Sequence, residues 1–213
     1  MEAMETTEQT AVENKITEAA FGLFCQKGIK SVSMDDIAQH LGMSKKTIYK
    51  WFENKDQIVY AACYNYLTSV ESRCEGIKTA TGNAIEELLD LMELNKCVFT
   101  KIHPFIFHDL QKYHRSSWEL WVSHKNNYIL QQIRQNIVRG MQEGLFKSDL
   151  EIDIVARLRL SMIEMPFNPA LFPPHQFNVT KVQLASLEHY MLGMATLKGH
   201  KMINAYKHIT EEE

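Results

Sequence analysis

Residues 33–55 read SMDDIAQHLGMSKKTIYKWFENK and contain two short helical patterns joined by a turn. In the first pattern, 34–41, apolar residues recur at spacings of three and four, which places them on one helical face. The second pattern, 44–52, is joined to the first by LGMS, a tight turn that carries glycine. This spacing is typical of a helix-turn-helix motif, whose second helix lies in the major groove of DNA.

Capping residues mark where these helices begin. Ser33 and Asp36 form a capping-box variant, with aspartate in place of the usual glutamate. Ser44 can cap the second short helix, and Asn54 with Gln57 indicates the start of a long helix. Each start in the motif therefore has a local physical cause.

The second short helix is expected to have a buried face and an exposed face. Its helical spacing turns three apolar residues toward a small core: Ile48, Trp51 and Phe52. The opposite face carries Lys46, Thr47, Tyr49 and Lys50. The polar face is therefore the one that would meet a partner.

Basic side chains concentrate in the same segment. Lys45, Lys46, Lys50 and Lys55 stand against one acid, Glu53, which gives residues 44–55 a charge of +3, whereas the whole chain carries -3. A local patch of this sign binds phosphates through counterion release. A lysine-rich helix face can also be simply solvated, but the caps, turn, core face and reversed charge together favour DNA binding.

The length, composition and net charge of the chain exclude several classes of protein. With 213 residues and 45% hydrophobic residues, the chain can form one or two folded domains. Its net charge argues against a protein that is basic all over, such as a nucleoid packager. The four dispersed cysteines are expected to be free thiols, and no apolar run is long enough to span a membrane. The polar, acidic N-terminus is no signal peptide, so we expect a cytoplasmic protein.

The rest of the chain is also expected to be helical. Longer helical patterns follow, at about 83–101, 104–112, 115–143, 150–165 and 179–206. The only strong interruption of the helical pattern is at 165–174, where four prolines exclude a continuous helix. The sequence therefore predicts an all-α fold: an N-terminal three-helix domain at 9–70 and a larger helical effector-binding and dimerisation domain at 71–213.

The N-terminal segment resembles the TetR family of transcriptional regulators. The resemblance covers residues 13 to about 60, and its motifs include LGMS at 41–44, TIYKWF at 47–52 and NKD at 54–56. The family pattern usually has His or Tyr where this chain has Trp51. This departure is expected to affect helix packing and the phosphate contact near it.

The resemblance implies roles for individual residues. Lys45, Lys46 and Thr47 would face base edges, while Tyr49 and Lys55 would hold backbone phosphates. Lys50 would contact backbone or bases. The two capping serines, Ser33 and Ser44, complete the predicted DNA-binding set.

Aromatic and histidine side chains gather in residues 99–128, where two interpretations remain open. One is a pocket for a largely apolar effector. The other is ordinary core packing. The candidate pocket residues are Phe99, His103, Phe107, His108, Trp118, Trp121 and Met162. The histidines do not repeat at three or four, so we expect no metal site here, and the sequence indicates no cofactor.

Two further expectations concern the C-terminal helices. Glu164 lies in an apolar stretch and needs a partner, either a ligand cation or, as we favour, a structural partner such as Arg159. The resemblance also implies a homodimer packed through 150–165 and 179–206. Such a dimer would present two recognition helices to a palindromic operator in double-stranded DNA.

These observations predict a transcriptional regulator, a repressor released from its operator by a small molecule. The alternatives are a helical protein–protein adaptor and a small-molecule-binding protein without sequence-specific DNA binding. An enzyme would need a nucleophile with its base, or a metal, and the sequence contains no such recognisable set.

Overall fold

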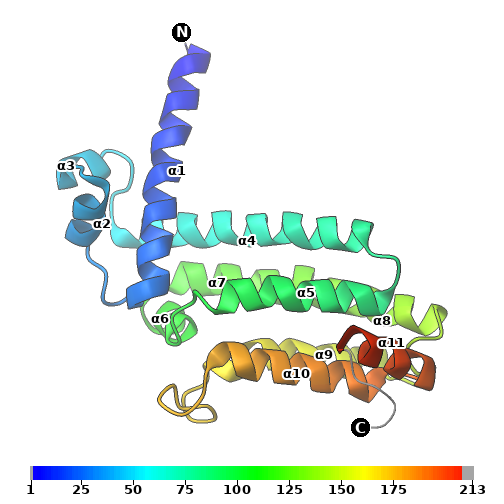
Figure 1. Cartoon of the computed structure of the whole chain (residues 1–213). Helices are drawn as coiled ribbons and strands as arrows, with labels where there is room; N and C mark the ends of the chain where they lie inside the picture. Colours follow the sequence, from blue (N-terminus) through cyan, green and yellow to red (C-terminus); the bar gives the residue numbers. More distant parts are fainter. Residues whose placement is uncertain (1, 208–213) are drawn as a thin grey trace. The chain divides into compact units, whose positions relative to one another are not determined.

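The computed structural model describes residues 2–207, apart from the side chains of residues 2–10, 98, 99 and 207. The predicted all-α fold is confirmed, since the described residues form helices and no strand (Figure 1). The helices are α1 (Glu2–Lys27), α2 (Met34–Leu41), α3 (Lys45–Ile48), α4 (Lys55–Ala80), α5 (Ala84–Phe99), α6 (Ile106–Tyr113), α7 (Arg115–His124), the π-helix η1 (Lys125–Ile129), α8 (Leu130–Gln142), α9 (Ile152–Glu164), the 3₁₀ helix η2 (Met165–Phe167), α10 (Val179–Met194) and α11 (Leu197–Lys207).

The chain packs as two compact units that are not simple halves of the sequence. The first comprises the residues up to Val70 together with Lys101–Val122. The second comprises Glu71–Thr100 together with the residues from Ser123 onward. The first unit thus includes α6 and α7 up to Val122. The domain boundary between residues 70 and 71 stays a prediction.

The first unit has a core built from α1, α2, α3 and α4. Ile16, Ile37, Ile48 and Ile58, one from each of these helices, are fully buried in it. From α6, Leu110 joins the same cluster. Because each buried aliphatic side chain contributes about 1.5–3 kcal/mol, this core holds the short α3 in place although its four residues could not form a stable helix alone.

The second unit has its own core from α5, α8, α9, α10 and α11. Its fully buried members include Ile85, Ile137 and Ile203. Within this unit α9 and α10 lie side by side (Figure 1). None of the helices in the described part of the chain is long and apolar enough to cross a membrane.

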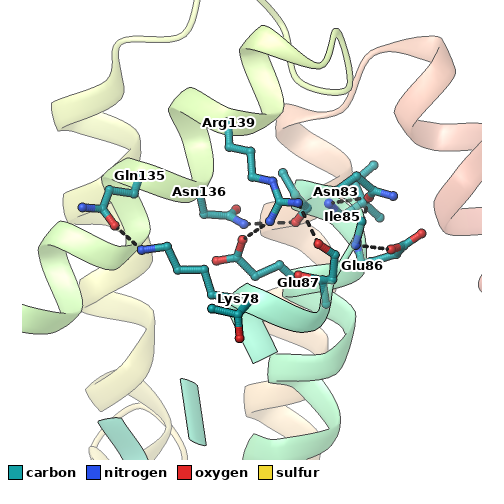
Figure 2. Close-up of polar contacts among 12 residues, drawn as sticks. Lys78, Asn83, Ile85, Glu86, Glu87, Gln135, Asn136 and Arg139 are labelled. Atoms are coloured by element: carbon teal, nitrogen blue, oxygen red, sulfur yellow. Dashed lines mark hydrogen bonds and ion pairs between the residues drawn. The ribbon is translucent and has the colours of Figure 1, made fainter. Parts of the chain in front are cut away.

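A polar network closes the end of the second unit where α5 begins (Figure 2). The Arg139 guanidinium donates to the Glu87 carboxylate at 3.1 Å and to the Thr81 carbonyl at 2.8 Å. Nearby, the Asn136 side-chain amide donates to the Ala84 carbonyl at 3.1 Å. The bond to Thr81 satisfies a carbonyl that the end of α4 leaves without an intrahelical partner.

Three of the helices expected from the sequence were wrong in extent. The helix predicted at 44–52 is α-helical only as α3, and a turn follows it. The pattern at 115–143 is divided by η1 between α7 and α8. The pattern at 179–206 breaks at Ala195, which is extended and forms an isolated bridge with Phe146. Periodicity cannot reveal these interruptions, because the apolar spacing continues through them.

Candidate DNA-binding surface

The helix starts predicted from the sequence are confirmed by their hydrogen bonds. Ser33 Oγ accepts from the Asp36 N–H at 3.1 Å, and the Asp36 carboxylate accepts from the Ser33 N–H at 2.8 Å. The hydrogen bonds from Ser33 also lower the pKa of Asp36. Asn54 Oδ1 accepts from the Gln57 N–H at 3.0 Å, as expected for the start of α4. The backbone entering α2 and α4 is therefore fixed by short local contacts.

The turn between α2 and α3 depends on Gly42 and Ser44. Gly42 has a φ of 63°, a left-handed conformation that favours glycine, and its N–H closes the end of α2. Ser44 Oγ accepts from the Thr47 N–H at 3.0 Å and lies 2.7 Å from the Thr47 hydroxyl. The two hydroxyls are thus engaged with each other, and Ser44 retains capacity for one further hydrogen bond and Thr47 for two.

The second half of the helix-turn-helix, residues 44–52 (the recognition segment), has the buried face and the exposed face that the sequence predicted. Ile48 and Phe52 are buried, and Trp51 packs partly against the same core. On the other side, Lys46 and Lys50 are exposed. Tyr49 and Thr47 lie among them, with Tyr49 exposed and Thr47 partly covered. Trp51, the departure from the family pattern, is accommodated by packing against the core of the first unit.

Two of the predicted DNA-binding lysines have partners within the chain. Lys45 forms an ion pair of 2.7 Å with Asp35, and this hydrogen bond raises the pKa of Lys45. Both side chains are exposed, so the pair contributes little stability. The half-buried Lys55 ammonium donates to the Ile29 carbonyl, and burial lowers its pKa. An ammonium has three N–H donors, so Lys55 retains donors for a phosphate.

Residues 101–122 support the DNA-binding part of the first unit, a feature that sequence reasoning missed. The buried Asp109 carboxylate accepts from the Lys30 backbone N–H at 2.9 Å, in the loop before α2. His114 Nδ1 lies 2.7 Å from the Asp56 carboxylate, in the first turn of α4. No local pattern could reveal these contacts, because Asp109 and Lys30 are 79 residues apart.

The candidate effector-pocket residues are divided between the two units. In the first unit, Phe107 and Trp121 have ring centroids 5.0 Å apart, and Trp118 packs partly against the core. The His103 ring lies so close to Gly28 that a Cβ there would be 3.2 Å from it. His108 Nδ1 lies 3.6 Å from the Asp109 carboxylate.

In the second unit, Met162 packs against the core cluster, and the Phe99 side chain lies outside the described residues. Packing thus accounts for Trp118, His103 and Met162. The pocket stays a prediction.

The partner of Glu164 is Lys125 rather than the expected Arg159. Lys125 Nζ lies 2.7 Å from the Glu164 carboxylate. The Arg159 guanidinium instead lies over the Tyr190 ring, 5.7 Å from its centroid, and burial lowers its pKa to about 10. Sequence proximity was misleading because Lys125 lies 39 residues away, in the π-helix.

Capped helices, a tight glycine turn and an exposed lysine-bearing face define a helix-turn-helix DNA-binding protein. Residues 16–62 match the model of the bacterial regulatory proteins, tetR family. The N-terminal segment is thus similar to the DNA-binding domain of this family, and the chain is a DNA-binding transcriptional regulator.

Relatives of this family match most of the chain. The uncharacterized HTH-type transcriptional regulator YvaF of Bacillus subtilis is 22% identical over 80% of this chain and 89% of its own length. The HTH-type transcriptional repressor KstR2 of Mycobacterium tuberculosis is 23% identical over 67% of this chain and 73% of its own length. A regulator from Saccharomonospora viridis, solved in complex with choline, shares the fold with a TM-score of 0.71 and 20% identity, covering 88% of this chain and 99% of that one.

Proposed function

We propose that this chain is a homodimeric repressor, acting in the cytoplasm, that a small-molecule effector releases from a palindromic operator. The observation that carries this proposal is the exposed face of the recognition segment, with Lys46, Tyr49 and Lys50 above the buried Ile48. Repression rather than activation is supported by the relatives that are named repressors, KstR2 among them.

In this proposal some residues of the exposed face contact bases and others contact phosphates. Lys46 and Thr47 would reach base edges in the major groove, where lysine pairs with guanine and threonine with several bases. Lys50 would meet either bases or backbone. The phosphate contacts would come from the Tyr49 hydroxyl and from the donors that Lys55 retains beside Ile29.

The proposed dimer uses the exposed faces of α9 and α10. On α9, Ile154 and Leu158 are four residues apart and both exposed, which is unusual for large aliphatic side chains of one helix face. On α10, the exposed residues Ala185 and Gly193 are small enough for a close approach of another helix. Two copies packed through these faces would bury the apolar surface and place the two recognition segments about a two-fold axis.

The effector is proposed to bind the predicted effector-binding domain at 71–213. It would favour a conformation whose recognition helices no longer match the operator. The shift cannot exceed the difference between the effector's affinities for the two conformations. The S. viridis relative was solved with choline, and the M. tuberculosis KstR2 structure is called a ketosteroid regulator. We propose a largely apolar effector for this chain, to which Phe107 and Trp121 would contribute their rings.

The proposal is tested by selecting bound sequences from random duplex DNA and measuring affinity against salt concentration. We expect a palindromic consensus and a linear fall of log K with log salt. The Lys55→Ala change should flatten the slope by about 0.9 for each phosphate contact that is lost, whereas Lys46→Ala should change the selected sequence. Lys15→Ala, an exposed lysine on α1, is the control. A protein that selects no sequence and shows no salt dependence would instead be an adaptor or a simple small-molecule binder.

A further inference from the structure

A basic and aromatic patch lies in the first unit, close to the helix-turn-helix but outside it in sequence. It consists of Lys30, in the loop between α1 and α2, and of Lys112 and Tyr113, the last two residues of α6. All three side chains are exposed, and we call them the α6 patch. The patch includes no residue of the recognition segment and none of α9 or α10, the helices of the proposed dimer.

The two lysines of the α6 patch converge on one aromatic ring. The Lys30 ammonium lies 5.3 Å from the centroid of the Tyr113 ring, and the Lys112 ammonium lies 5.5 Å from it. A hydrogen bond with Lys30 and the charge of Lys112 lower the pKa of the exposed Tyr113 hydroxyl. Two ammoniums beside one hydroxyl repel each other, and an anion that binds between them relieves this repulsion.

The positive charge of the patch is not neutralised within the chain. The buried Asp109 carboxylate, on α6, accepts from the Lys30 backbone N–H at 2.9 Å. Among the residues that the structure describes, neither the Lys30 nor the Lys112 ammonium forms an ion pair with a carboxylate. Two ammoniums beside one buried carboxylate leave the patch positive, so it is complementary to an anion.

The patch adjoins Lys55, which is predicted to hold a DNA phosphate. The Lys55 ammonium donates to the carbonyl of Ile29, the residue directly before Lys30. Three residues after Lys30, Ser33 caps α2 and belongs to the predicted DNA-binding set. Positive charge therefore continues from the first turn of α4, past the loop before α2, to the end of α6.

The loop that carries Lys30 is held against α6, which lies beside the end of α1 (Figure 1). Before Lys30, Gly28 packs so closely that a Cβ there would lie 3.2 Å from the His103 ring and 3.4 Å from the Asp109 carboxylate. This packing and the hydrogen bond from the Lys30 N–H fix the backbone of the loop. A site whose backbone is already ordered loses less conformational freedom when it binds.

We propose that the α6 patch binds a backbone phosphate of the operator, with Lys30 and Lys112 on the phosphate oxygens and the Tyr113 hydroxyl donating beside them. Lysine and tyrosine are both used for phosphate contacts. A DNA phosphate offers only acceptors, which suits two ammoniums and a hydroxyl. The inference rests on the proposed operator binding and extends it from the helix-turn-helix to α6. Because phosphates carry no sequence information, the patch should add affinity without sequence preference.

The first experiment measures affinity against salt concentration for a duplex selected from random DNA and for a random duplex. The double change Lys30→Gln and Lys112→Gln should weaken binding to both by the same factor. It should also flatten the slope of log K against log salt by about 0.9, the effect of one lost phosphate contact, and leave the selected sequence unchanged. The control is Lys15→Gln with Lys96→Gln, which removes two exposed lysines from α1 and α5.

Tyr113→Phe tests the hydroxyl separately. It keeps the ring over which the two ammoniums lie, so the patch keeps its shape and charge. Binding to both duplexes should weaken by about two- to tenfold, the effect of one hydrogen bond. Thermal unfolding should not change, because the side chain is exposed. This variant keeps the inference testable even if the double lysine variant does not fold.

Each result decides a different point. A double variant with the salt slope of the wild type, or a Tyr113→Phe variant with unchanged affinity, would overturn the inference and leave the proposed function intact. A wild-type protein that binds no duplex would overturn both. NMR of the Tyr113 ring during titration with sodium phosphate, against sodium chloride at equal ionic strength, tests a free anion as the ligand. Saturation by phosphate together with an unchanged salt slope in the double variant would assign the patch to a free anion instead of DNA.

Discussion

The Lys55 ammonium, at the first residue of α4, donates a hydrogen bond to the Ile29 carbonyl in the loop after α1. Ile29 is itself buried in the core of the first unit. A residue predicted to hold a DNA phosphate therefore also ties α4 to the loop that precedes the helix-turn-helix. Binding and folding effects of any change at Lys55 will be linked for this reason.

Replacement of Lys55 by methionine is expected to lower stability and DNA affinity together. Methionine keeps the length of the side chain but removes the donor, so the Ile29 carbonyl loses its partner at a cost of about 1–3 kcal/mol. Urea denaturation gives the stability change, and affinities for operator and random duplexes should fall by similar factors. If stability does not change, the hydrogen bond to Ile29 does not hold the loop.

Tyr49→Phe tests the proposed contact between the exposed Tyr49 hydroxyl and a DNA phosphate. Removal of the hydroxyl should weaken operator binding by about 0.5–1.5 kcal/mol, the contribution of one hydrogen bond. Stability should not change, because Tyr49 is exposed. Tyr64→Phe, at an exposed tyrosine on α4, is the matched control for fluorescence anisotropy. Equal affinities of the Tyr49 and Tyr64 variants would show that the Tyr49 hydroxyl does not contact DNA.

Features that depend on neighbours in sequence were predictable, and those that depend on distant residues were not. The caps at Ser33 and Ser44 were readable because donor and acceptor are three residues apart. The pairing of Lys125 with Glu164 spans 39 residues, so local spacing pointed to Arg159 instead. The break at Ala195 has a similar cause. Thr196 bonds there to the Leu145 carbonyl at 2.9 Å, a partner that the apolar pattern of 179–206 cannot indicate.

Gly140→Ala is expected to destabilise the second unit. A Cβ at Gly140 would lie 2.0 Å from the ring of Phe146, which is itself fully buried. Forcing that ring to move should reduce the free energy of unfolding by about 1–3 kcal/mol. Gly76→Ala is the control, because its new methyl group meets nothing within 4 Å. The higher helix propensity of alanine should raise the free energy of unfolding by about 0.5–1 kcal/mol. Thermal unfolding of the two variants should therefore shift in opposite directions.

Leu158→Lys tests the proposed dimer. Its side chain is 55% exposed on α9, and a lysine there would place two like charges near the proposed two-fold axis. Sedimentation should then show a shift toward monomer and a loss of operator affinity. Leu171→Lys is the control, because Leu171 is 57% exposed but lies in the loop before α10. A Leu158 variant that stays dimeric would place the interface elsewhere.

The His124 imidazole is expected to make stability depend on pH. Burial lowers the pKa of His124, although the Glu71 carboxylate, 2.9 Å from Nδ1, opposes this shift. The unfolded chain, with a histidine pKa of about 6.5, therefore takes up a proton at a higher pH than the folded chain does. This contribution to stability is complete above the unfolded pKa and is lost as the pH falls from there toward the folded pKa.

Urea denaturation at pH 7.5 and 5.5 (conditions chosen to bracket a value of about 6.5) measures this dependence. The wild-type protein should lose more unfolding free energy between the two conditions than His124→Gln, whose side chain does not titrate. His175→Gln, at an exposed histidine in the loop before α10, is the control and should behave as the wild type does. If the His124 variant loses as much stability on acidification as the wild type, protonation of this buried ring does not contribute to acid sensitivity.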